Sequence, residues 1–264
     1  MAAAVRASLD DNGKSLQEIL IELSSQIDQH GDANLVNVDR NNILDGARRG
    51  FTRKKFRAEC KLSIKFSGEY GIDEGGPSRE FMMLALKAIH ESPIFEGEEN
   101  AKIICPDLPS ADRNDYYIFG NMIAYFIVHK GPSPCFFSST MYQLLAGKPC
   151  YPNIADVGDF EIRTQLQMIK ETEDLRKISL PESIMQAVEY VGAVPLLSLN
   201  KKDKILDALL DYFVLNRVKG VLPQFLDGLS SLGILKAIRE FLVTMRPLFI
   251  YQKAAAATTA YIEE

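Results

Sequence analysis

The stretch LSIKFSGEYGIDEGGPSREFMMLAL, residues 62–86, decides the fold because it joins a strand to a helix through a glycine-rich turn. Its first five residues alternate apolar and polar side chains, which predicts a half-buried β-strand over 62–66. Glycines crowd the acidic segment 67–78, where they permit tight backbone turns. Pro77 suits the first turn of a helix, and Phe81 begins the apolar face that predicts this helix.

Upstream of this stretch the sequence predicts two helices. Ser15 and Glu18 have the spacing of a capping box, in which each side chain satisfies an unpaired backbone N–H at the start of a helix. Apolar residues then recur at helical intervals as far as Ile27. A second helix is predicted over 39–50, with Asp39 at its start.

Downstream, the hydrophobic spacing is mainly helical. Residues 92–115 are typical of a loop-rich segment with a short strand at 102–105. Further helices are predicted over 115–129, 136–146, 159–172, 181–191, 203–218, 223–228 and 231–243. We therefore expect an α+β fold that is predominantly α-helical, with a few short strands.

Composition narrows the class of protein. The net charge of −5 and the isoelectric point near 5.4 argue against a nucleic-acid partner. No apolar run approaches the roughly 18 residues that a membrane span requires, and the first residues lack the apolar core of a signal peptide. We expect a cytoplasmic or nuclear protein with no membrane association.

The thiols and imidazoles do not have metal-binding spacing. The cysteines are Cys60, Cys105, Cys135 and Cys150. They form no CxxC pair, and none lies at zinc-finger spacing from a histidine. We therefore expect no metal and no cofactor.

Two segments of the sequence allow a functional and a structural interpretation. Cys135 follows His129 by six positions and could be an activated thiolate, but free cysteines are mostly small buried hydrophobic residues. The glycine-rich turn could hold a phosphate, but no Lys-Ser or Lys-Thr follows its glycines. Glu69, Asp73 and Glu74 would repel the anion, so a structural turn is favoured.

The same stretch resembles the signature of the HECT domain of ubiquitin ligases, in which a strand and a Gly-Glu turn precede a Gly-x-Asp-x-Gly-Gly loop and a helix. The matching residues are Gly68, Glu69, Gly71, Asp73, Gly75, Gly76, Arg79, Glu80 and Phe81. Residues 35–47, 116–137, 144–149 and 209–229 are also similar to segments of this family, and the later residues resemble the branch of the G2/M-phase-specific ligase.

The resemblance implies a lobe that docks a ubiquitin-loaded conjugating enzyme, followed by a smaller lobe whose cysteine carries ubiquitin as a thioester. We expect a tail and amphipathic helix over 1–34 and a HECT N-lobe-like domain over 35–250. Residues 171–203 would form a reduced docking subdomain, and 251–264 stand where the catalytic lobe would begin. No cysteine follows Cys150, so we expect no catalytic residue in this chain.

The resemblance leaves two functions open. The first is a lobe of a ubiquitin-protein transferase, whose partners would be ubiquitin and a conjugating enzyme and whose substrate is unknown. The alternative is a non-catalytic interaction module, or a competitor of a complete ligase. Partner docking is predicted at Met185, Val188, Tyr190, Val191, Leu196 and Leu197, with ordinary core packing as the alternative.

Two further features have predicted roles. Glu69, Asp73, Glu74, Arg79 and Glu80 would form a charge network that fixes the turn, with a solvated charged face as the alternative. Asn121 occupies a position where the family commonly has arginine, which would alter a buried or interlobe contact.

Overall fold

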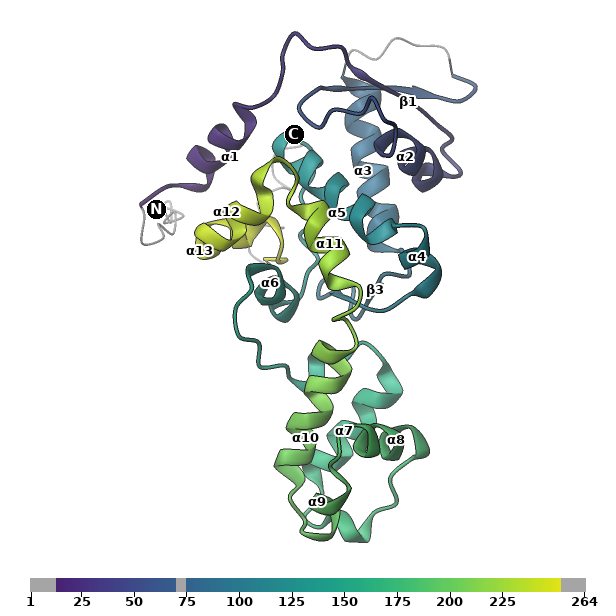
Figure 1. Cartoon of the computed structure of the whole chain (residues 1–264), viewed down its shortest axis with the longest axis vertical. Helices are drawn as coiled ribbons and strands as arrows, with labels where there is room; N and C mark the ends of the chain where they lie inside the picture. Colours follow the sequence, from purple (N-terminus) through teal and green to yellow (C-terminus); the bar gives the residue numbers. More distant parts are fainter. Residues whose placement is uncertain (1–12, 70–74, 253–264) are drawn as a thin grey trace, which may run out of the picture.

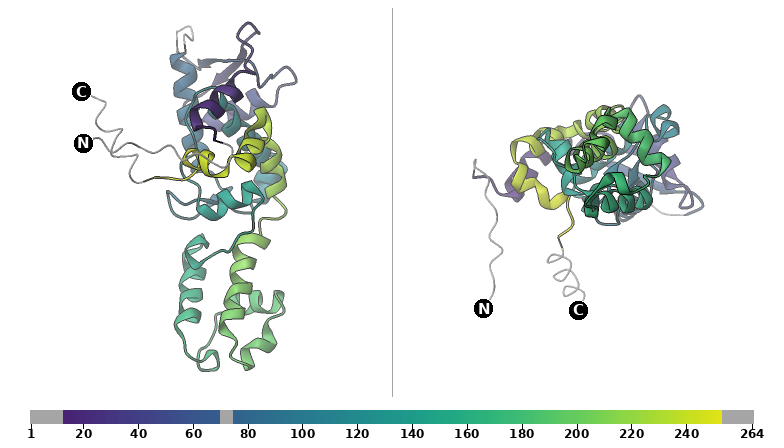
Figure 2. Two further views of the ribbon diagram at one scale, coloured as in Figure 1. Left: turned by 90° about the vertical axis from the view of Figure 1, so that its left-hand side faces the viewer. Right: turned by 90° about the horizontal axis from the view of Figure 1, so that it is seen from below.

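The computed structural model describes residues 13–69 and 75–252, which form a larger body above and a smaller helical unit below (Figures 1 and 2). The helices of the body are α1 (Leu16–Ser24), α2 (Ile43–Phe51), α3 (Gly76–His90), α4 (Leu108–Asp112), α5 (Asp115–Val128), α6 (Ser139–Ala146), α11 (Leu222–Leu229), α12 (Ile234–Glu240) and α13 (Leu242–Met245). The helices of the helical unit are α7 (Phe160–Glu171), α8 (Glu182–Tyr190), α9 (Val194–Ser198) and α10 (Lys202–Leu210).

The strands of the body form two short pairs. β1 (Asn34–Val38) lies parallel to β2 (Leu62–Phe66), and β3 (Phe95–Glu96) lies antiparallel to β4 (Ile103–Ile104). The chain passes from β1 through α2 to β2, since a parallel pair needs a crossover connection. One face of this pair packs on α2, where the absence of a side chain at Gly46 gives room to Val38.

Helix α5 is the centre of the body. Nearly all of its side chains are buried, which explains its uniformly apolar sequence. Helix α11 crosses it very closely, because Gly120 and Gly228 present only backbone at the contact. A Cβ atom at Gly120 would lie 2.5 Å from the carbonyl oxygen of Phe225, and one at Gly228 would collide with the carbonyl oxygen of Tyr117.

The structure confirms the predicted α+β, predominantly helical class and several local predictions. The capping box of α1 is present, with the Ser15 backbone N–H donating to the Glu18 carboxylate at 2.7 Å. The strand at 62–66, the helix that begins near Pro77 and the buried helix from residue 115 also form. Within the described residues, no helix has the length and apolar character needed to cross a membrane.

Several predicted helices begin or end elsewhere. The first ends at Ser24, before Ile27, and the second begins at Ile43 rather than at residue 39. The Asp39 carboxylate accepts a hydrogen bond from the backbone N–H of Asn41. This contact stabilises a turn and does not cap a helix. The helix expected over 136–146 begins at Ser139, because the Ser138 hydroxyl caps it.

Other helices are divided or were not predicted. In place of the helix expected over 203–218, the α-helical part ends at Leu210 and a π-helical segment, Asp211–Asn216, follows it directly. The one expected over 231–243 is broken, since Leu232 and Gly233 are left-handed and the helix restarts at Ile234. The sequence did not predict β1, β3, α4 or α9, which are short elements with weak periodic signals.

Candidate functional site

Strand β2 and helix α3, which precede and follow residues 70–74, pack against each other in the body. Gly68 and Gly75 have φ angles of 81° and 105°, a region that residues with a Cβ atom avoid, and Gly75 precedes α3 directly. The Ser78 hydroxyl donates to the carbonyl oxygen of Leu62 at 3.1 Å, which ties the helix back to the strand. Of the matched residues, Gly71 and Asp73 lie outside the described part of the chain.

Arg40, which is distant in sequence, forms hydrogen bonds with Glu69 and Glu80 of this segment. Its Nε donates to Glu69 at 2.5 Å and its Nη1 to Glu80 at 2.6 Å, so one guanidinium joins the turn to the first part of α3. The same guanidinium lies over the Phe66 ring, 4.0 Å from its centroid. Glu69 and Glu80 therefore share one cation, Arg40, which the sequence analysis did not include in the network with Arg79.

This network is open to solvent and still changes the acidity of its carboxyl groups. Hydrogen bonds from Arg40 lower the pKa of Glu69 and of Glu80 below the ordinary value for glutamate. The Arg40 guanidinium has its own pKa raised by the same two partners. Asp73 and Glu74, also predicted in this network, lie outside the described residues.

Phe81 anchors α3 in the core. Its side chain is fully buried and meets the Phe126 ring of α5 edge-on, with centroids 6.3 Å apart. The neighbouring matched residues Gly76, Arg79 and Glu80 are exposed. The start of α3 thus buries the Phe81 side chain in the core and exposes the charged side chains of Arg79 and Glu80 to solvent.

A buried carboxylate that sequence reasoning missed joins α2 to α5. Asp115 is fully buried, and Arg48 donates to it from Nε at 2.5 Å and from Nη2 at 3.1 Å. Arg113 adds a contact at 2.9 Å. Paired arginines compensate the cost of burying this charge. Asp115 was predicted only as a helix start, because partners so distant in sequence leave no local signal.

The residues predicted for partner docking do not form a single patch. Val188 is buried in the core of the helical unit, and Val191, Leu196 and Leu197 pack partly buried against that core. Tyr190 is 75% exposed beside the Tyr212 ring, and Met185 is half-buried. The nearby Leu199 of the α9–α10 connection is 62% exposed and was not predicted.

The four cysteines are free thiols that are buried or partly buried. Cys60 and Cys105 are buried, and burial raises the pKa of Cys105 to about 12. Burial also raises the pKa of the partly buried Cys150. Thiols with raised pKa values are poor nucleophiles at neutral pH.

Cys135 and His129 have separate surroundings. The Cys135 sulfur lies 3.3 Å from the Ser133 hydroxyl and 3.6 Å from the carbonyl oxygen of Pro247. The His129 ring donates to the carbonyl oxygen of Ala58 at 2.8 Å and stacks on Tyr125, and burial lowers its pKa. The contacts of His129 are thus to Ala58 and Tyr125, and among the described residues it makes no hydrogen bond with Cys135.

Ion pairs brace the helical unit against the body. Glu96 of β3 accepts from Arg217 at 3.2 Å, and Glu98 accepts from Arg163 of α7 at 2.7 Å. Burial raises the pKa of Glu96 even though Arg217 opposes the effect. Gly158 lies against the Glu96 side chain, so the connection into α7 also packs here.

Asn121, singled out as a departure from the family, lies in the contact between α5 and α11. Its side chain is 6% exposed, and its Oδ1 has no hydrogen-bond partner among the described residues. Asn121 therefore lies at a buried contact between two helices, where Gly228 of α11 approaches the Asn121 backbone nitrogen closely.

Curated proteins share this sequence over most of its length. The chain is 30% identical over 249 residues to the G2/M phase-specific E3 ubiquitin-protein ligase of Gallus gallus, a match that covers 90% of this chain and 33% of that protein. The ligase of that name from Homo sapiens is 27% identical, with 86% of this chain and 33% of that protein covered. The E3 ubiquitin-protein ligase Nedd-4 of Drosophila melanogaster is 25% identical, over 78% of this chain and 22% of its own length.

These matches confirm the resemblance that the sequence predicted: the chain is a HECT-type ubiquitin-ligase domain sequence. Within that class, the G2/M phase-specific ligases are more similar to this chain than Nedd-4 is, in agreement with the branch that the sequence predicted. No family model matches the chain. The chain spans about a third of the length of the first curated relatives it matches.

Proposed function

We propose that this chain acts as the N-terminal lobe of a HECT-type ubiquitin ligase, which docks a ubiquitin-loaded conjugating enzyme and carries no ubiquitin itself. The observation that carries the proposal is the pair of hydrogen bonds from Arg40 to Glu69 and Glu80, two residues of the segment that matches the HECT signature. The similarity to curated ligases supports it. We keep the domain bounds proposed from the sequence, 35–250 for the lobe and 171–203 for its docking part; the helical unit itself contains α7 to α10, residues 160–210.

The helical unit is the proposed docking part. It projects from the body and is reached by the chain twice, before α7 and after α10 (Figures 1 and 2). Tyr190 and Leu199 leave apolar area in solvent there, and exposed aromatic and aliphatic side chains are common anchors at interfaces. Buried Val188 and the half-buried Leu196 and Leu197 would support this surface rather than contact the partner.

The chemistry of the thiols supports the absence of transfer by this chain. A thioester carrier needs an accessible thiolate with a nearby group that favours its charge. Cys60 and Cys105 are buried, Cys150 has a raised pKa, and Cys135 faces backbone carbonyl oxygens. We therefore propose that ubiquitin stays on the conjugating enzyme while it is bound here.

A thioester assay tests the absence of transfer. The full chain is mixed with activating enzyme, conjugating enzyme, ATP and labelled ubiquitin, and the products are separated without reductant. We expect labelled thioester on the two enzymes and none on this chain. A ubiquitin adduct on this chain that disappears with reductant and in the Cys135→Ser variant would contradict the proposal.

A second function, competition with a complete ligase, is favoured by the composition of the helical unit. Between residues 160 and 210, all of which the structure describes, the chain forms helices and no strand, which supports the proposal of a reduced docking part. An excess of this chain added to a complete ligase and its substrate tests for competition. A competitor lowers the yield of modified substrate as the chain is added, whereas a chain without docking leaves the yield unchanged.

A further inference from the structure

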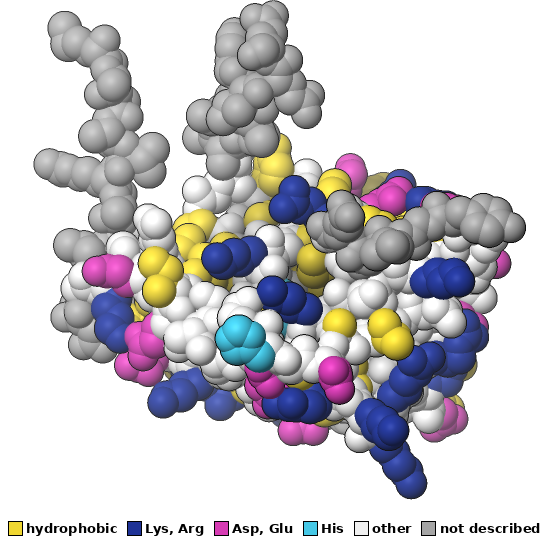
Figure 3. Space-filling view, turned by 90° about the horizontal axis from the view of Figure 1, so that it is seen from above, with side chains coloured by type: hydrophobic (Ala, Val, Ile, Leu, Met, Phe, Trp, Pro, Cys, Tyr) yellow, Lys and Arg dark blue, Asp and Glu magenta, His cyan; other side chains and the backbone are white. Residues whose placement is uncertain are grey.

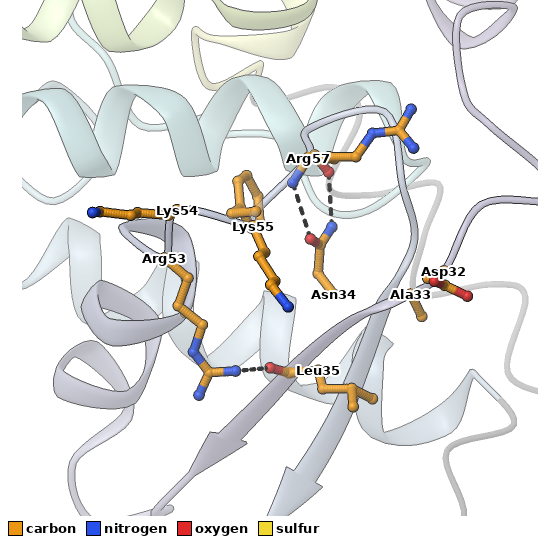
Figure 4. Close-up of a pocket in the computed structure, with 10 residues that line it drawn as sticks. Asp32, Ala33, Asn34, Leu35, Arg53, Lys54, Lys55 and Arg57 are labelled. Carbon is orange, nitrogen blue, oxygen red and sulfur yellow. Dashed lines mark hydrogen bonds between the residues drawn. The ribbon is translucent and has the colours of Figure 1, made fainter.

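A second surface of the body combines cations, apolar atoms and a hollow of about 580 Å³, which the proposed function does not use. The loop of residues 53–57, between α2 and β2, forms one wall, and residues 32–35 at the start of β1 form the other (Figure 4). The end of the body seen from above carries Lys and Arg side chains over much of its face, among hydrophobic and acidic side chains (Figure 3).

The loop concentrates positive charge in a chain whose net charge is −5. Its cations are Arg53, Lys54, Lys55 and Arg57, and all are exposed. Arg57 lies 3.4 Å from Asp28, and Arg53 donates to the carbonyl oxygen of Leu35. Among the described residues, neither Lys54 nor Lys55 is in an ion pair, so their charges are available to a ligand.

The backbone of the loop is fixed in position. The Asn34 side chain accepts from the Arg57 N–H at 3.0 Å and donates to the Arg57 carbonyl oxygen at 2.7 Å. Phe56 packs on Phe51 of α2, with ring centroids 4.5 Å apart. A fixed loop loses less conformational entropy when a ligand binds, which favours binding.

The directions of the side chains decide between ligands. Arg53 and Lys55 extend from the loop toward β1, whereas Lys54 and Arg57 point away (Figure 4). The four charges therefore do not converge on one point, as a single phosphate would require. They suit an extended polyanion that crosses the hollow.

An apolar contact at the centre of this surface favours an acidic peptide over a nucleic acid. Leu35 is 65% exposed, and Ala33 and Phe56 also line the hollow. A leucine or aromatic side chain of a peptide can cover Leu35 while flanking carboxylates meet Lys55 and Lys54. A sugar–phosphate backbone offers no aliphatic side chain that could cover Leu35, which favours the peptide.

We propose that an acidic, leucine-containing segment of a partner protein binds across the hollow beside β1, where it contacts Lys55 and the exposed face of Leu35, and that it continues along the loop to Lys54. The contact would be separate from the docking of a conjugating enzyme, because it uses the body and not the helical unit. It would give the lobe a means of recruiting a second protein.

Fluorescence anisotropy of the full chain tests this proposal. The probe is a fluorescein-labelled synthetic peptide that alternates glutamate and leucine. We expect saturable binding that weakens with added salt and falls about tenfold in a Lys54→Glu, Lys55→Glu variant. The Leu35→Ser variant should also weaken it, since an apolar contact is lost.

Matched controls keep the result specific. A Lys201→Glu, Lys204→Glu variant has the same change of charge on exposed residues of the helical unit, and should bind the probe as the unaltered chain does. The melting temperatures of both variants establish that each is folded. No binding by the unaltered chain, an equal loss in both charge variants, or displacement of the peptide by single-stranded oligothymidine at lower concentration would overturn the proposal.

Discussion

At the scale of single residues, the closest approach in the core depends on Gly228. A methyl group at this position would collide with the carbonyl oxygen of Tyr117 and lie 2.9 Å from the nitrogen of Asn121. Both are backbone atoms of α5, so neither can turn aside. Gly228→Ala should therefore lower the free energy of unfolding in urea by more than about 2 kcal/mol.

Gly220→Ala is the control for this change. A Cβ atom at Gly220 meets no atom within 4 Å, so its effect should stay within about 0.5 kcal/mol. Equal stability of the two variants would show that α5 and α11 do not meet through these glycines.

Arg40 allows a second test at this scale. Because it lowers the pKa values of Glu69 and Glu80 in the folded chain, its contribution is present above the ordinary pKa of glutamate. That contribution is lost as the pH falls through the lowered values. Arg40→Gln should thus be less stable than the unaltered chain at neutral pH, and the difference should vanish in acid.

Carboxyl NMR titration reports the same effect directly. Both glutamates should return toward their ordinary pKa values in Arg40→Gln, while Arg79→Gln should leave them lowered, since Arg40 is the hydrogen-bonding cation for both. If Arg79→Gln shifts them and Arg40→Gln does not, the turn is held as the sequence pattern alone suggested.

At the scale of elements, the joint between body and helical unit depends on Glu96 and Arg217. Burial raises the pKa of Glu96 and Arg217 lowers it. Arg217→Met should therefore raise this pKa further, whereas Lys219→Met, at an exposed position nearby, should not. Because the pKa of Glu96 is higher in the folded chain than in the unfolded chain, stability decreases as the pH rises from the ordinary glutamate pKa through the raised value. The Arg217→Met variant should therefore lose more stability over this pH rise than the unaltered chain.

Carboxyl NMR and urea unfolding at several pH values measure both effects. An unchanged Glu96 pKa in the Arg217 variant would mean that the pair does not form in solution.

Sequence reasoning predicted those elements whose signals are local. The capping box at Ser15 and Glu18, the alternation before Gly68 and the proline at the start of α3 each lie within a few residues. It missed β1, which is short and is recognisable as a strand only when paired with β2.

Candidate-site contacts between distant residues could not be predicted in the same way. Arg40 is 29 positions from Glu69 and 40 from Glu80, and Arg48 is 67 positions from Asp115. Such pairs depend on how α2 packs against its neighbours, which no spacing rule contains. The exposure of Tyr190 beside buried Val188 likewise follows from the packing of α8, although both were predicted together.

At the scale of the whole molecule, we propose that the helical unit docks the conjugating enzyme and that the body binds a second partner. The body contains the hydrogen bonds from Arg40 to Glu69 and Glu80 and the basic hollow, and the helical unit presents Tyr190 and Leu199. If docking occurs on the helical unit, loss of these exposed side chains should weaken it without unfolding the chain, because neither is part of the buried core.

Calorimetric titration of a ubiquitin-loaded conjugating enzyme into the full chain is the most direct test of this account. We expect saturable heat from at least one member of a panel of such enzymes, and a loss of about tenfold in affinity for a Tyr190→Ser, Leu199→Ser variant. Ile21→Ser, at an exposed apolar residue of the body, should bind as the unaltered chain does. No heat from any loaded enzyme, or the same affinity for all of these variants, would contradict the proposal that this chain is a docking lobe.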